Sequence, residues 1–182
     1  MAARCTVGDG FGGPEKCRTP LRHLRSRGEE RHMEHEIRWL RTFVVQTLQD
    51  AFGERPEVDS DGDVAVRQGT AACYVSCHDG GFPVVRVWAI AAMGLRAQGK
   101  LLREINDVNA GTMTAHVYFA NGLVYVEQNL HAYGVDEDTL GQAFIAVAGV
   151  ANNIGSLMAM TFGGDTPYPA DTEDADAHDE AA

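Results

Sequence analysis

The feature that most constrains this chain is a run of 26 positions, residues 139–164, without a single charged side chain. A run of this length could cross a bilayer as one helix. However, Gln142, Asn152 and Asn153 interrupt it, five glycines thin it, and no basic flank follows it. We therefore expect a helix packed in a protein core, and we predict neither a membrane span nor a membrane partner.

Apolar residues in this run recur at three- and four-residue steps, which is the spacing of one helix face. Asp136 is the expected N-cap, and Glu137 and Asp138 suit the positive end of the helix dipole. The predicted core face comprises Leu140, Phe144, Val147, Ala151, Ile154 and Met158.

Two further segments show the helical period. Residues 33–52 carry an apolar stripe that Gly53 and Pro56 should end, with Trp39 and Phe43 widening it. The stripe comprises Ile37, Leu40, Val44, Leu48 and Ala51. Residues 100–109 form the other predicted helix, with Leu101, Leu102, Ile105 and Val108 as its apolar positions.

Between the helices, apolar and polar residues alternate in the manner of half-buried strands. The turn signals are Asp61-Gly62, Asp79-Gly80-Gly81 and Asn121-Gly122, of which Asn-Gly is the strongest hairpin signal. Hairpins imply antiparallel pairing. We therefore predict an α+β fold with an antiparallel sheet and the element order α-β-β-β-α-β-β-α.

Charge divides the chain into three parts. The formal net charge is −11, from 15 basic and 26 acidic residues, and this disfavours general nucleic-acid binding. We predict a disordered basic head over residues 1–32, one folded domain over residues 33–164, and a disordered acidic tail over residues 165–182. Met33 offers an alternative start that would make the head non-native. Because the head holds no apolar stretch of signal length, we expect a cytoplasmic protein.

Catalytic and metal-binding motifs give no positive signal. Cys73 and Cys77 share one face of a predicted strand about 13 Å apart, at ~3.3 Å per residue, which is too far for one zinc ion. We expect both to be buried. No spacing argument joins His116, Glu127 and Asp107 into an acid–base group. We predict no enzyme, no metal and no cofactor.

The alternation assigns each strand residue to one of two sheet faces. The face predicted to meet the helices carries Cys73, Val75, Val85, Val87, Val117, Phe119, Val124 and Val126. The opposite face, called here the open face, carries Tyr74, Arg86, Trp88, Ile90, His116, Tyr118, Tyr125 and Glu127. Aromatic residues with an arginine are typical of interface cores. The alternatives are that the second helix or a second copy covers this face, or that the register is shifted by one residue.

Two stretches resemble the YbjN-like family, whose fold is similar to that of class I type III secretion chaperones. They are Leu101–Asn109, with its Ile-Asn-x-x-Asn step, and Val117–Val126, which contains the Asn-Gly hairpin. The predicted element order resembles that of the family over residues 33–164.

This resemblance implies a small, non-catalytic, homodimeric domain that binds a segment of another protein. It places a dimer interface at Leu102, Ile105, Val108, Tyr118 and Tyr125. It places the partner segment near Trp39, Phe43 and Trp88, and the pattern of the open face adds Tyr74 and Arg86 to the candidate partner-binding residues. The alternatives are a regulatory domain that senses a small molecule and a minor enzyme.

Overall fold

The computed structural model describes residues 27–53, 55–79 and 82–170. Its first half contains α1 (Arg27–Phe52), β1 (Glu57–Val58), β2 (Val64–Gln68), β3 (Ala71–Asp79) and β4 (Pro83–Ala92). Its second half contains α2 (Gly99–Gly111), β5 (His116–Ala120), β6 (Leu123–His131), the 3-10 turn η1 (Ala132–Gly134) and α3 (Glu137–Phe162). The strands form one antiparallel sheet in the order β1-β2-β3-β4-β6-β5.

The predicted α+β class and antiparallel sheet are confirmed. Two details differ from the expected order. A two-residue strand, β1, precedes the three expected ones, and α1 begins at Arg27 rather than at Met33. Residues 1–26 of the predicted head, residues 171–182 of the predicted tail and the turn glycines at 80–81 lie outside the described residues.

The turn between β5 and β6 and the N-cap of α3 form where the sequence predicts them. Asn121 and Gly122 both have positive φ (53° and 83°), as a type I′ hairpin turn requires between β5 and β6. The Asp136 side chain accepts a hydrogen bond from the Thr139 N–H and caps α3, which ends at Gly163 in the left-handed conformation.

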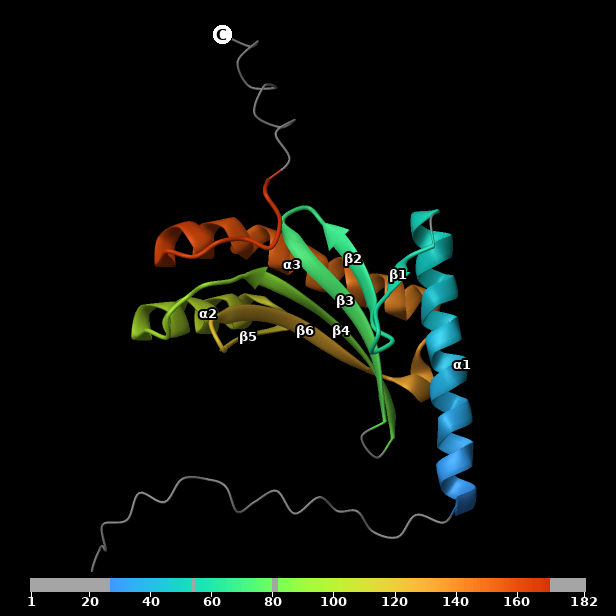
Figure 1. Cartoon of the computed structure of the whole chain (residues 1–182). Coiled ribbons are helices and arrows are strands. Elements are labelled where there is room, and N and C mark those ends of the chain that lie inside the picture. The colour runs from blue at the N-terminus through green and yellow to red at the C-terminus, as the bar shows by residue number, and fades with distance from the viewer. Residues whose placement is uncertain (1–26, 54, 80–81, 171–182) are drawn as a thin grey trace, which may run out of the picture.

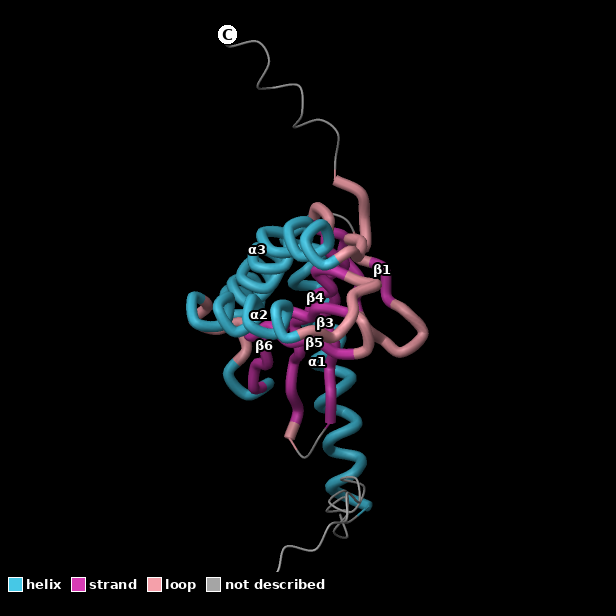
Figure 2. The backbone as a smooth tube through the Cα atoms, turned by 90° about the vertical axis from the view of Figure 1, so that its left-hand side faces the viewer, coloured by secondary structure: helices cyan, strands magenta, loops and turns pink. Residues whose placement is uncertain are grey.

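Helices α1 and α3 pack on the same face of the sheet, α1 standing across one end and α3 running behind the strands (Figure 1). Helix α2 packs against β5, and in the turned view α2 and α3 lie to the same side of the strands (Figure 2). The side chains of Leu101 and Ile105 on α2 join the same core as those of α3. The alternative that α2 covers the open face is therefore not what the structure shows.

Helix α3 is long and apolar enough, by length and composition alone, to span a membrane. Here it is a core helix, because its predicted core face packs on β4 and β6. Leu140, Phe144, Val147, Ala151 and Met158 are buried, and Ile154 is partly buried. The contact with β4 is close at Gly155, where an added Cβ would lie 2.6 Å from the Ala91 carbonyl oxygen. A register shift between Ile90 and Ala92 marks a bulge at this point.

The chain stays attached to the sheet beyond residue 164, which corrects the predicted start of a solvated tail at 165. Asp165 forms a two-way backbone bridge with Met93, and the Tyr168 N–H donates to the Thr70 carbonyl. The Arg67 guanidinium lies 5.0 Å from the centre of the Tyr168 ring. The acidic composition of the tail does not prevent these contacts, because they involve the first residues after α3 and most of the tail's carboxylates come later in the chain.

One asparagine of the Ile-Asn-x-x-Asn step closes the outer edge of β5. The Asn109 side-chain N–H donates to the Val117 carbonyl (2.9 Å), and its Oδ1 accepts from the Val117 N–H (2.8 Å). An edge strand otherwise presents such groups to any passing chain. Asn109 thus takes the place of a neighbouring strand at this position.

We expect Asn109→Ala to lower the free energy of unfolding by about 1–3 kcal/mol, because both Val117 backbone groups lose a partner at a partly buried site. Urea denaturation of the full chain measures the effect. Asn106→Ala is the matched control, since Asn106 is exposed on the same helix. Equal losses in the two variants would contradict the edge-closing role.

Candidate functional site

Aromatic side chains from four neighbouring strands form a continuous row on the open face. Tyr74 of β3 stacks on Trp88 of β4, with ring centres 4.3 Å apart. Trp88 lies 6.1 Å from Tyr125 of β6, which stacks on Tyr118 of β5 at 5.1 Å. The His116 ring continues the row, 5.8 Å from Tyr118.

Strand register builds this row. Tyr74 is directly opposite Trp88, and Tyr118 is directly opposite Tyr125. Trp88 is a diagonal neighbour of Tyr125, since Ile90 is the residue paired with Tyr125. Opposite and diagonal neighbours are close enough for aromatic side chains to touch. The aromatic row is therefore fixed by pairing across three strand interfaces.

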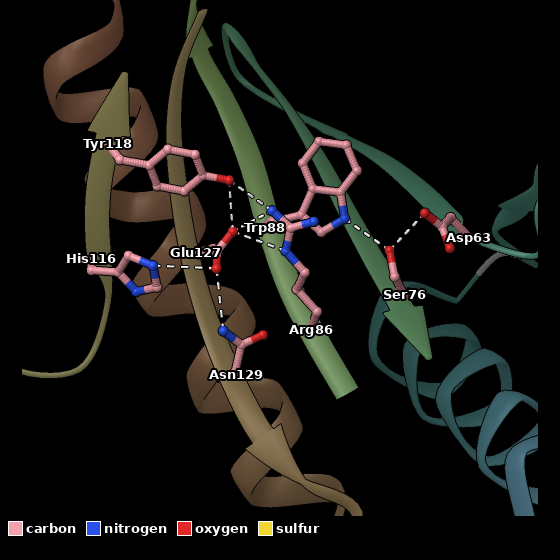
Figure 3. A network of polar contacts seen from close by, with 8 residues as sticks. All are labelled: Asp63, Ser76, Arg86, Trp88, His116, Tyr118, Glu127 and Asn129. Carbon is pink, nitrogen blue, oxygen red and sulfur yellow. Dashed lines mark hydrogen bonds and ion pairs between the residues drawn. The ribbon is translucent and has the colours of Figure 1, made fainter. Parts of the chain in front are cut away.

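A polar network crosses the row at Arg86 (Figure 3). The Arg86 guanidinium donates to Glu127 Oε2 through both Nε and Nη2, and Nη2 also donates to the Tyr118 hydroxyl at 2.8 Å. That hydroxyl in turn donates to Glu127 Oε2, also at 2.8 Å. The three side chains form a closed triangle in which each pair is joined.

The second carboxylate oxygen of Glu127 is also occupied. Asn129 donates to Oε1 at 3.2 Å, and His116 Nε2 lies 3.2 Å from the same atom. On the other side of the row, Trp88 Nε1 donates to the buried Ser76 hydroxyl, which donates to Asp63 at 2.6 Å. The polar atoms under the row are thus largely paired within the chain.

The network sets the protonation of its members. Burial raises the pKa of Glu127, but hydrogen bonds from Arg86 and Tyr118 outweigh this and leave the pKa below its usual value. Burial and the neighbouring carboxylate raise the pKa of Tyr118 to about 12. At neutral pH the site holds a fully engaged carboxylate and a neutral phenol, which suits a structural network better than acid–base catalysis.

The two strand cysteines are buried, as predicted. They lie on the helix-covered face, and burial raises the pKa of Cys73 to about 12 and that of Cys77 to about 11. Their thiols are therefore neutral and poorly reactive. Within the described residues, no cluster of His, Cys, Asp and Glu side chains is arranged to hold a metal ion.

The structure brings Tyr74, Arg86, Trp88, Tyr118 and Tyr125 together on one face, and burial confirms the face assignment on which their prediction rests. Trp39 and Phe43 lie elsewhere. They stack on each other on α1 at 5.6 Å, and within the described residues no ring contact joins them to the aromatic row.

The predicted dimer residues on α2 differ in how deeply they are buried. Leu102 is 51% exposed, whereas Ile105 is buried in the chain's own core and Val108 is partly buried against it. Ile105 is therefore unavailable to a partner, because the helix turns it toward the sheet.

Sequence reasoning missed Asp63, Ser76 and Asn129 as members of the network. Ser76 and Asn129 follow the same two-residue alternation as Arg86, so the sequence alone could assign them to the open face. The contact of Asp63 could not be predicted in this way, because Asp63 reaches Ser76 from the turn before β2 and only the tertiary structure brings the two together.

The fold has solved counterparts. A chain of the ExsC–ExsE complex matches with a TM-score of 0.54 and 11% identity, covering 66% of this chain and 94% of that one. YbjN from E. coli matches with a TM-score of 0.50 and 16% identity, covering 67% and 92%. No curated protein sequence matches closely enough to count as a relative.

These two structures share the fold of this chain. Residues 38–170 match the sequence model of the family described as T3SS (YopN, CesT) and YbjN peptide-binding chaperone 1. The chain therefore belongs to this peptide-binding chaperone family, and the predicted resemblance is confirmed. The matched region ends at residue 170 and includes the segment that bonds to Met93 and Thr70.

We expect Glu127→Gln to reduce the loss of folding stability at acidic pH. The pKa of Glu127 is lower in the folded state than in the unfolded state. The stabilisation that its ionised form provides is therefore fully present above the unfolded pKa, near 4.5, and is lost as pH falls through the folded pKa. Chemical denaturation at a series of pH values from neutral to acid measures this. Glu104→Gln, at an exposed position on α2, should leave the curve unchanged. Parallel curves for wild type and Glu127→Gln would contradict the assignment.

Proposed function

We propose that this chain is a non-catalytic, homodimeric chaperone of the cytoplasm that binds a segment of another protein on its open sheet face. The observation that carries the proposal is the aromatic row, which spans β3, β4, β6 and β5 within a domain of the peptide-binding chaperone family. The structural counterpart ExsC–ExsE is itself a complex of two proteins, which supports a protein partner.

The row is suited to hold a segment because binding costs the chaperone little side-chain conformational entropy. Its rings already stack on one another, so few side-chain rotations are lost when a partner binds. The Arg86–Glu127–Tyr118 triangle keeps polar groups paired at its centre. A partner therefore gains apolar and aromatic contact without breaking a strong internal bond.

Dimerisation is proposed through α2 and the neighbouring edge of the sheet. Leu102 is the exposed apolar residue of α2, and Met113, just after the helix, is 98% exposed. Tyr118 lies on β5, the strand against which α2 packs. Leu102 and Met113 offer an apolar contact near β5, the strand at the end of the aromatic row, so a second copy could extend the surface offered to one partner.

We expect Trp88→Ala to weaken partner binding by more than about 30-fold, because a central aromatic anchor is a typical hot spot. The tagged full chain captures its partner from native lysate, and the partner, once identified, is titrated against each variant. Trp39→Ala is the matched control, since it removes an exposed tryptophan from α1. Circular dichroism checks that both variants fold.

Retained binding in Trp88→Ala with loss in Trp39→Ala would move the site from the sheet to α1. A wild-type chain that captures no partner would count against the chaperone proposal itself.

We expect Leu102→Asp to convert the dimer to monomer, because a carboxylate would be buried against an apolar surface. Sedimentation velocity of the full chain measures this. Leu157→Asp is the matched control, with 54% exposure on α3 against 51% for Leu102. A wild-type monomer, or a dimer that survives Leu102→Asp, would overturn the proposed interface.

A further inference from the structure

An apolar concavity lies away from the open face, between the C-terminal end of α1 and the first half of α3. This α1–α3 groove has a volume of about 600 Å³. Its apolar lining includes Leu48, Phe52, Phe144, Ile145 and Ala148. Phe52 and Phe144 contact each other edge to face with ring centres 5.3 Å apart.

The groove exposes large apolar side chains where a surface usually carries polar ones. Ile145 is 65% exposed and Phe52 is 44% exposed. Gly141 and Gly149 also line it, and an added Cβ at either would meet no atom within 4 Å. The space above these glycines is therefore open to a partner's side chains.

Among the residues that the structure describes, the charged ones that line the groove all have one sign. They are Asp50 on α1 and Glu137 and Asp138 at the start of α3. These three carboxylates outweigh the partial positive charge of about half a unit at a helix N-terminus. The rim therefore favours a cationic occupant.

The chain's own basic head is a poor candidate for this place. It joins α1 at Arg27, whereas the groove lies at the opposite end of that helix. The groove begins at Thr47, roughly 30 Å along the helix from Arg27 at ~1.5 Å per residue, so about nine extended residues are needed to reach it. Those residues include Arg18, Arg22 and Arg25. Residues 1–17, which precede them, hold two basic residues, Arg4 and Lys16, balanced by Asp9 and Glu15.

The folded domain of a second copy fits no better, because residues 32–164 hold 8 basic and 15 acidic side chains. We infer that the α1–α3 groove binds a cationic amphipathic segment of a separate protein, with apolar side chains over Phe52 and Ile145 and lysine or arginine beside Asp50 and Asp138. This inference rests on the proposed function and adds a second contact point and a charge preference for the partner.

The test uses two synthetic peptides with the same length and the same leucine and phenylalanine positions. One carries lysine and the other glutamate at the remaining positions. Fluorescence anisotropy with the full chain should show the lysine peptide binding at least about tenfold tighter, with the difference shrinking as salt rises.

Three variants locate the site. Gly149→Leu fills the groove on an exposed helix position and should abolish binding of the lysine peptide. Asp50→Asn combined with Asp138→Asn should weaken it several-fold. Glu104→Gln combined with Asp107→Asn removes the same charge from the exposed side of α2 and should leave binding unchanged.

Equal binding of both peptides, no binding of either, or binding that survives Gly149→Leu would overturn the inference. The proposed function is judged separately, because capture of a native partner that depends on Trp88 would stand in each of these cases. Gly149→Leu binding as in wild type, together with loss in Trp88→Ala, would show that the lysine peptide uses the open face instead.

Discussion

One-sided packing of the sheet is the constraint on which the rest of this structure depends. The largely apolar helix α3 and the apolar face of α1 cover the side of the strands that carries Val75, Val87 and Val126. Since side chains alternate along a strand, the residues on either side of each of these valines point to the opposite face. The aromatic row and the Arg86 network are therefore consequences of the same alternation that builds the core.

The open face keeps a large apolar surface within a stable native fold. The rings of Tyr74, Trp88, Tyr125 and Tyr118 cover one another, and hydrogen bonds hold Trp88 and Tyr118 in place. The edge of the sheet receives similar protection from Asn109. The fold thus leaves these rings on an uncovered sheet face while the backbone groups at that part of the β5 edge are already paired, which limits indiscriminate strand pairing.

The α1–α3 groove differs from the open face in chemistry as well as position. The open face has its charges paired, whereas the groove has an acidic rim beside exposed phenylalanine and isoleucine. A partner that touches both would meet an aromatic platform and an acidic, apolar cleft. On the proposal that both surfaces bind the partner, they would distinguish among segments that a single apolar patch would not.

Periodicity in the sequence alone determined the fold class, the strand faces and the core side of α3, because each residue's direction follows from helix or strand geometry. The Asn121-Gly122 turn and the Asp136 cap were equally local and equally readable. The tertiary structure alone decided that Ile105 faces inward, that Trp39 stands apart from Trp88, and that Asp63 reaches Ser76. It also decided that residues 165–168 return to the sheet and that a groove opens between α1 and α3. These features depend on how separate elements meet in space, and no period within one element specifies that.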